Sequence, residues 1–396
     1  MRVPRTWEPG INHGHLNRLR ISAAAFGLVA LSCVPFIPIC QSSPTSQGPL
    51  TRPDLAQSKD TKMGAIATKV REFNEDLPVG GLAFSRDGTR LAVNPTFAGS
   101  DVHVWDWTNG KRTNLVFHNV ASPGDGSELQ FSVDGLLLAV GHQRSSKENG
   151  FSVIRIWDAQ RAIAERDIAE PSGGDNKSIA FTPDGALFIR TTNVSGNVGD
   201  DFVVHRVATW NVEWSLRLFP LLPRSLALSP DSRFAAIGGE VRLRGSPVKI
   251  RPQIVIVDLS ARRVVRTIDG AFPDHNVILT LAWSPDGALL AAGGIVQGSY
   301  PGPDGVKIFD PSNGKQIASE PIAGAAYVSG LAFTPDGRYL VEAYLEGHVR
   351  IWDGHHGKLL QTIPLDDHFH PAIGITRDSH HIAIASGKAI SIWQLN

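Results

Sequence analysis

The stretch Leu331-Ala332-Phe333-Thr334-Pro335-Asp336-Gly337 decides the fold of this chain, because its pattern returns along the sequence. Two bulky apolar residues flank a small one, and a turn of the form Ser/Thr, any residue, Asp, then Gly or Ser follows. Such turns occur at 85–88, 132–135, 182–185, 229–232, 284–287, 334–337 and 376–379, and their aspartates are spaced by 47, 50, 47, 55, 50 and 42 residues. A period of about 40 to 50 residues is typical of a repeated four-stranded unit.

Each unit has the residue pattern of short β-strands joined by tight turns. Period two places Leu331 and Phe333 on one face of a strand and Ala332 on the other, where a neighbouring sheet can approach closely. In the turn, proline fixes φ, aspartate bonds to nearby backbone, and glycine accepts a left-handed conformation. A second strand, a third such as 349–353 and a fourth such as 358–363 complete the unit. We therefore expect an all-β chain whose sheets are packed on both faces.

The third strands carry an aromatic residue followed by an acid. The pairs are Trp105-Asp106, Trp157-Asp158 and Trp352-Asp353, with Trp210-Asn211, Val257-Asp258 and Phe309-Asp310 as weaker equivalents. Over about 65–396 the chain resembles the WD-repeat β-propeller family. The resemblance implies a seven-bladed β-propeller and a role in binding other proteins.

Closure of the ring is also predicted from the sequence. The last repeat ends directly after its third strand, whereas Ala65 to Phe73 form a spare strand before the first repeat. This N-terminal strand should complete the last blade and remove the exposed edges of an open array. The glycine-histidine pair of the family is absent, and only Glu346 approximates its acidic residue before the third strand. We therefore expect apolar packing, rather than a buried polar network, to supply most of the stability.

Composition limits the classes of partner. The chain has 396 residues, of which 42% are hydrophobic, and the repeat occupies 64–396 as a single domain. Its 38 basic and 38 acidic side chains cancel, so no long-range field favours nucleic acid. Only two cysteines occur, at positions 33 and 40, so the repeat region has neither a disulfide framework nor a thiol nucleophile.

The N-terminal residues 1–40 have the features of a signal peptide or membrane anchor. Four arginines precede an apolar stretch from Ile21 to Ile39, which is about long enough to span a bilayer. Three fates are open: an uncleaved anchor, lipid attachment at Cys33 after a lipoprotein-like box, or ordinary cleavage. All three place the repeat region outside the cytoplasm, either membrane-anchored or periplasmic or extracellular. Residues 41–63 are polar and rich in Ser, Thr and Pro, which predicts a flexible linker.

Long connections between second and third strands gather on one face of the predicted ring, at 141–150, 191–201, 238–252 and 293–304. They are either a partner footprint or tolerated surface insertions. The third of them carries a basic cluster, made up of Arg242, Arg244, Lys249 and Arg251. This cluster could hold a carboxylate, a phosphate or a sulfate, or could be a solvated basic loop.

Two charged residues, Arg190 and Glu342, stand where the other units place an apolar residue, six positions after the turn aspartate. A charge at a packed position is unfavourable unless it is paired or lies at the rim. Both residues are candidates for contact with a partner. The alternative is that each lies at the end of its strand and meets water or a local partner.

No catalytic or metal-binding motif stands out. His368 and His370 share one side of an extended segment, but two histidines in a polar loop are more often simply exposed, and we predict no metal and no cofactor. Nothing matches a nucleophile elbow, a phosphate loop or a dinucleotide fingerprint. The sequence thus favours a noncatalytic, exported scaffold that binds a protein. The alternative is a propeller enzyme, a lactonase-like hydrolase or an oxidoreductase, acting on a small molecule at the channel mouth.

Overall fold

The computed structural model describes residues 65–95, 101–115, 129–132, 135–141, 152–170, 175–193, 200–243, 249–296, 304–321, 327–355, 357–367 and 371–396. Every regular element in these ranges is a β-strand, and residues 62–396 form one compact unit. The predicted leader with Cys33, and all of the predicted linker 41–63, fall outside the described residues. Among the residues described, none belongs to an apolar helix of membrane-spanning length.

The strands form seven four-stranded antiparallel sheets, which we call blades 1 to 7. In chain order the strands are, for blade 1, β2 (Val79–Phe84), β3 (Arg90–Pro95), β4 (Val102–Asp106) and β5 (Lys111–Leu115); for blade 2, β6 (Leu129–Phe131), β7 (Leu136–Gly141), β8 (Ser152–Asp158) and β9 (Ile163–Glu170); for blade 3, β10 (Asp175–Phe181), β11 (Leu187–Asn193), β12 (Phe202–Arg206) and β13 (Val212–Leu216); for blade 4, β14 (Leu221–Leu228), β15 (Phe234–Leu243), β16 (Lys249–Asp258) and β17 (Arg263–Asp269); for blade 5, β18 (Asn276–Trp283), β19 (Leu290–Val296), β20 (Asp304–Phe309) and β21 (Gln316–Pro321); for blade 6, β22 (Val328–Phe333), β23 (Tyr339–Tyr344), β24 (His348–Asp353) and β25 (Leu359–Pro364); and for blade 7, β26 (Ala372–Ile375), β27 (His381–Ser386), β28 (Ala389–Leu395) and β1 (Ala67–Asn74).

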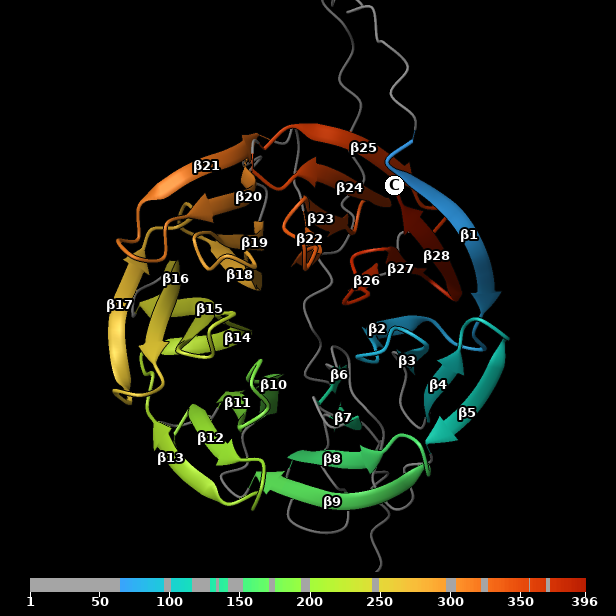
Figure 1. Ribbon diagram of the computed structural model, residues 1–396. Helices are drawn as coiled ribbons and strands as arrows, with labels where there is room; N and C mark the ends of the chain where they lie inside the picture. The colour runs from blue at the N-terminus through green and yellow to red at the C-terminus, as the bar shows by residue number, and fades with distance from the viewer. Residues whose placement is uncertain are drawn as a thin grey trace, which may run out of the picture. The chain divides into compact units, whose positions relative to one another are not determined.

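The blades are arranged around a common centre, so the unit is a β-propeller. In each blade the first strand lies nearest the centre and the fourth at the rim (Figure 1). Because successive strands are antiparallel, the connections from second to third strand and from one blade to the next emerge on the same face. We call this the loop-rich face, and the opposite one, which carries the repeated turns, the turn face.

The N-terminal strand closes the ring, as the sequence predicted. β1 pairs with β28 from Ala67 opposite Leu395 to Asn74 opposite Ala389. Blade 6 holds the same strand from the side, because the Gln361 side-chain amide accepts the Ala67 N–H at 2.8 Å and donates to the Ala67 carbonyl at 3.0 Å. The two ends of the folded unit are thus bound to each other and to a neighbouring blade.

The turn that recurs in the sequence is a compact hydrogen-bonded motif. In blade 7 the Thr376 hydroxyl donates to Asp378 Oδ1 at 2.6 Å, and the same oxygen accepts the backbone N–H of His380 at 3.0 Å. The Thr376 hydroxyl oxygen also accepts the N–H of His381 at 2.9 Å. The corresponding Ser/Thr-to-Asp bond measures 2.5–2.7 Å in every turn whose four residues are all described. The Ser/Thr and Asp positions are therefore fixed by the turn itself.

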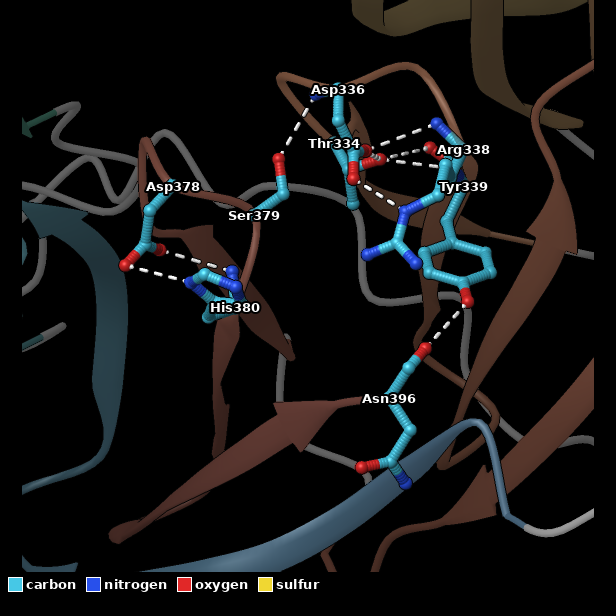
Figure 2. A network of polar contacts seen from close by, with 8 residues as sticks. All are labelled: Thr334, Asp336, Arg338, Tyr339, Asp378, Ser379, His380 and Asn396. Atoms are coloured by element: carbon cyan, nitrogen blue, oxygen red, sulfur yellow. Dashed lines mark hydrogen bonds and ion pairs between the residues drawn. The ribbon is translucent and has the colours of Figure 1, made fainter.

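Two serines replace the turn glycine and link neighbouring blades. Ser232 and Ser379 have φ of 60° and 63°, a left-handed conformation that costs a residue other than glycine about 1–2 kcal/mol. Each hydroxyl accepts a backbone N–H from the turn of the preceding blade, Ser379 from Asp336 at 3.0 Å and Ser232 from Asp184 at 3.1 Å. Figure 2 shows the first of these bonds, together with the Tyr339 hydroxyl donating to the carbonyl of Asn396. These side chains bind adjacent blades on the turn face.

The aspartate that ends most third strands caps the next turn. Asp158 Oδ1 accepts the backbone N–H groups of Gln160 at 2.8 Å and Arg161 at 3.0 Å, and Asp258 bonds the two corresponding N–H groups in blade 4. Aspartate bonds to backbone two or three residues ahead in such turns because its side chain is short. The acid of the Trp-Asp pair is therefore a turn residue, and its carboxylate is occupied locally.

The hydrophobic core lies between blades. Ile189 and Phe202 of blade 3 pack with Ile237 and Val255 of blade 4, and similar clusters fill the other described junctions. Gly238 marks how close the blades come, because a Cβ atom there would lie 2.6 Å from Ile278 of blade 5. Such a distance is well inside van der Waals contact, so a glycine is required at this position.

The repeated turns should make the protein sensitive to acid. Burial opposes ionisation of Asp378, but hydrogen bonds from Thr376 and His380 outweigh it and lower the pKa of Asp378 to about 2. Because this pKa lies below the unfolded value of about 3.9, the contribution is present at neutral pH and is lost as pH falls toward 2. We expect Asp378→Asn to lower the urea midpoint at pH 7 and to match the wild type near pH 2. The exposed Asp274→Asn is the control, and parallel curves for Asp378→Asn and wild type would contradict the assignment.

Closure of the ring should depend on Gln361. Its replacement by alanine removes both side-chain bonds to Ala67, and we expect a loss of about 1–2 kcal/mol in the free energy of unfolding. Gln316→Ala is the matched control, because Gln316 is exposed on the outer strand of blade 5. Urea denaturation measures both variants, and equal effects would show that the bonds to Ala67 do not stabilise the ring.

Candidate functional site

The hairpin β15–β16 of blade 4 is the most distinctive feature of the loop-rich face. Its strands pair over ten residues each, from Phe234 opposite Asp258 to Leu243 opposite Lys249. The other second-to-third strand ladders in the described ranges have at most six pairs. The prediction of a loop over 238–252 is therefore wrong for most of its length, and only 244–248 lie outside the described residues. The alternation of apolar and basic residues at 241–243 and 249–251 was the available signal for strand.

Strand geometry separates the predicted basic cluster into two groups. Successive side chains alternate between faces, so Arg242 shares a face with Glu240, whereas Arg251 and Lys249 lie on the other face, opposite Val241 and Leu243. Arg244 falls outside the described residues. These residues are close in the sequence, but the register of the hairpin places them on two different faces.

Two arginines converge on the buried carboxylate of Glu240. Arg224, at a bulge in β14, donates from Nε and a terminal nitrogen to the two carboxylate oxygens at 3.2 and 3.0 Å. Arg242 donates from Nε and a terminal nitrogen to Oε1 at 3.0 and 2.7 Å. The Glu240 side chain is 0% exposed, whereas those of Arg224 and Arg242 are 27% and 53% exposed. We call these three residues the arginine–glutamate cluster.

The charge of Arg224 also acts on Tyr327, a residue from another part of the ring. It directly precedes β22 of blade 6, and its backbone N–H donates to Glu346 Oε1 at 3.0 Å. Burial raises the pKa of the Tyr327 hydroxyl, while the positive charge of Arg224 acts in the opposite direction. The hydroxyl therefore lies within electrostatic reach of Arg224, although the two residues belong to nonadjacent blades. Glu346, the acid noted in the sequence before the third strand of blade 6, thus accepts a hydrogen bond from the backbone just before the first strand of the same blade.

Arg190 is buried in blade 3 and contacts a histidine. It is 5% exposed and stands in the middle of β11, and its Nε donates to His205 Nε2 at 3.3 Å. His205 Nδ1 lies 3.2 Å from the carbonyl of Trp210. Because a guanidinium only donates and a carbonyl only accepts, His205 is the neutral tautomer with its proton on Nδ1. Arg190 does not lie at a strand end or reach water, but it does meet a local partner, as one alternative expected, and the structure does not place it on a partner-binding surface.

The register of blade 3 also corrects the assignment of its aromatic residue. His205 lies opposite Phe188, as Trp352 of blade 6 lies opposite Leu340. His205 thus occupies the position of the third-strand tryptophan, whereas Trp210 follows β12 in a turn and has a φ of 60°. Sequence reasoning matched Trp210 by residue type, because blade 3 has no tryptophan on its third strand.

Glu342 is buried in blade 6 and accepts two hydrogen bonds. Its Oε2 receives the Tyr344 hydroxyl at 2.5 Å and the Trp352 indole N–H at 2.7 Å, and the residue is 0% exposed. Burial raises the pKa of the Tyr344 hydroxyl far above its usual range, and the charge of Glu342 adds to this effect. Tyr344 is therefore a neutral donor. Glu342 too lies inside its strand rather than at the end, and it meets local partners, as the same alternative expected.

A third buried carboxylate lies in the connection from blade 7 into blade 1. Glu75, just after β1, contacts His103 Nδ1 at 2.6 Å and accepts the Trp105 indole N–H at 2.5 Å. Together with Glu342 this corrects the expectation that apolar packing replaces a polar network. The third-strand tryptophans of blades 1 and 6 each donate to a buried carboxylate. In blade 1 this carboxylate comes from the connection before the first strand, and in blade 6 it comes from the second strand. The acceptor's position varies with the blade, so a single sequence pattern could not reveal it.

Comparison with known families agrees with this architecture. The family model described as "WD domain, G-beta repeat" matches residues 263–295 and 314–353. The chain therefore contains WD repeats. Each matched WD repeat begins in or just before the outer strand of one blade and continues into the next, β17 to β19 in the first case and β21 to β24 in the second. No curated protein shows significant sequence similarity to the chain.

Among the described residues of this WD-repeat protein, no group of three or more His, Cys, Asp or Glu side chains is arranged to hold a metal ion. His368 and His370, the pair considered from the sequence, fall outside those residues. Glu240 is a fully buried acid near the loop-rich face, and its oxygens are occupied by four N–H contacts. The arrangement is suited to binding through the arginines rather than to removing a proton from a substrate.

Replacing Glu342 should destabilise blade 6. Glu342→Leu leaves the buried Tyr344 hydroxyl and Trp352 indole without this acceptor, and we expect a loss of about 2–3 kcal/mol. Glu342→Gln keeps an acceptor oxygen and should lose less. Equilibrium denaturation followed by tryptophan fluorescence measures the difference. The exposed Glu165→Leu should stay within about 0.5 kcal/mol, and a Glu342→Leu variant as stable as wild type would refute the role of the network.

Proposed function

We propose that this WD-repeat protein is a noncatalytic scaffold that binds a protein partner through its loop-rich face, with the β15–β16 hairpin as the main contact. WD-repeat propellers generally act in protein interaction, which supports the class of function. The proposed domain is a seven-bladed ring with one blade extended on that face. The hairpin is the observation that carries the proposal.

The extension of this hairpin is considerable. Four residue pairs beyond the six of the next-longest ladders correspond to about 13 Å at ~3.3 Å per residue. A paired hairpin is ordered before binding, so less conformational entropy is lost on association than with a flexible loop. A rigid projection of this kind supplies a specific contact on an otherwise repetitive ring.

We propose further that the scaffold acts outside the cytoplasm. The arginines before the apolar stretch 21–39 support export, and the polar residues 41–63 would give a tether. The N-terminal segment would be the only part in contact with a membrane. A near-neutral charge balance speaks against nucleic acid as the partner.

A trimmed hairpin tests the proposed contact. Replacing 242–250 by Asn-Gly joins Val241 to Arg251, which are directly opposite in the ladder, so a two-residue turn preserves the register. We expect this variant to keep the wild-type circular dichroism and to lose at least about 90% of the captured partner, because the contact surface is gone. Capture uses a C-terminal affinity tag after crosslinking of intact cells with a membrane-impermeant reagent.

Two controls test the hairpin contact and the proposed export independently. Ile163→Ser changes another exposed residue, 57% accessible, at the start of β9 on the turn face, and should retain the partner. Partner capture that survives trimming but not Ile163→Ser would contradict the hairpin contact. Capture obtained only with a membrane-permeant crosslinker would contradict export while leaving the scaffold role standing.

A further inference from the structure

The arginine–glutamate cluster has an unusual charge arrangement for a surface site. Two guanidiniums share one carboxylate, so two positive charges and one negative charge leave a single net positive charge. The carboxylate is fully buried beneath the arginines, which are themselves partly open to solvent. The acid therefore fixes the position of both cations without covering them.

Each arginine has hydrogen-bonding capacity left over. The contacts with Glu240 use Nε and one terminal nitrogen of each guanidinium. A guanidinium has five N–H donors in a planar fork, and within the described ranges the second terminal nitrogen of Arg224 or Arg242 has no further partner. The remaining donors are held in place by the buried carboxylate, so little side-chain entropy is lost when an anion binds.

We propose that Arg224 and Arg242 form a receptor for a carboxylate of the partner, the side chain of an Asp or Glu in an acidic peptide segment. This inference rests on the proposed function and specifies the chemistry of the partner at the same hairpin. Glu240 is the positioning residue.

The charge balance favours a carboxylate over a phosphate. A phosphate group carries about −1.5 to −2 charges at neutral pH, and it would approach the Glu240 carboxylate as well as the arginines. A single net positive charge matches a monoanion, and a planar carboxylate suits the planar donors of a guanidinium. The site should therefore prefer an acidic side chain of a protein to a phosphorylated one.

Binding of a fluorescent hexaglutamate peptide tests the proposal, with hexaglutamine as the uncharged control probe. Fluorescence anisotropy with the folded protein at about 0.1 M salt gives the affinity. We expect Arg242→Ala to weaken hexaglutamate binding about tenfold, the effect of losing one charge-assisted bond pair. Arg251→Ala removes the same charge from the opposite face of the same hairpin and should change binding by less than about twofold. Equal losses in both variants, or no binding by the wild type, would overturn the site.

Glu240→Gln provides a second, independent readout. It raises the net charge of the cluster from one to two, so inorganic phosphate should compete with hexaglutamate several-fold better against this variant than against wild type, relative to acetate. An unchanged ratio of phosphate to acetate competition would contradict the charge argument, provided that the circular dichroism of the variant is native.

These results are distinguishable from failure of the scaffold role. If the trimmed hairpin loses its cellular partner but Arg242→Ala keeps full hexaglutamate affinity, the carboxylate receptor is wrong and the hairpin contact stands. If Arg242→Ala loses both hexaglutamate and the cellular partner while Arg251→Ala keeps both, the receptor is supported.

Discussion

The pairing of β1 with β28 is the constraint on which the rest of the structure depends. Each blade packs only against its two neighbours, so an open row of blades would expose two apolar sheet faces. Blade 7 would also lack its outer strand and present an unpaired edge. The antiparallel ladder from Ala67 to Asn74 removes that edge and joins the two ends of the folded unit. Gln361 and Tyr339 of blade 6 add bonds to this closure, so the ring is fastened across two blades.

Inside the ring, different residues solve the same local problem in different blades. A tryptophan on the third strand has a polar indole N–H that must find an acceptor when it is buried. Glu342 supplies the acceptor in blade 6 and Glu75 supplies it in blade 1, while blade 3 replaces the tryptophan by a histidine bonded to Arg190. These charges are tolerated because each has a partner within its own blade or at its entrance.

One blade of the ring differs from the others in its described strands. Blade 4 differs by continuing its second and third strands beyond the common length, which carries Arg242 away from the repetitive surface. The other ends of these two strands pack in the hydrophobic cores that blade 4 shares with blade 3 and with blade 5. The hairpin is therefore continuous with the folded core. The buried carboxylate of Glu240 then holds two arginines at the base of this projection. In the proposed scaffold, this hairpin is the contact with the partner, and it needs no flexible loop.

The sequence by itself determined the repeat, the class of fold and the closing strand, because tight turns and period-two strands are local features that each residue pattern specifies. It also singled out Arg190, Glu342 and the basic residues near 242–251 as exceptional. Only the tertiary structure decided what they do, because burial and partners depend on strand register and on blades distant in the chain. Register split Arg242 from Arg251, placed His205 rather than Trp210 beside Arg190, and brought Arg224 to Glu240. A shift of one residue in any of these strands would have reversed the faces, and which face is buried depends on packing against the neighbouring blades.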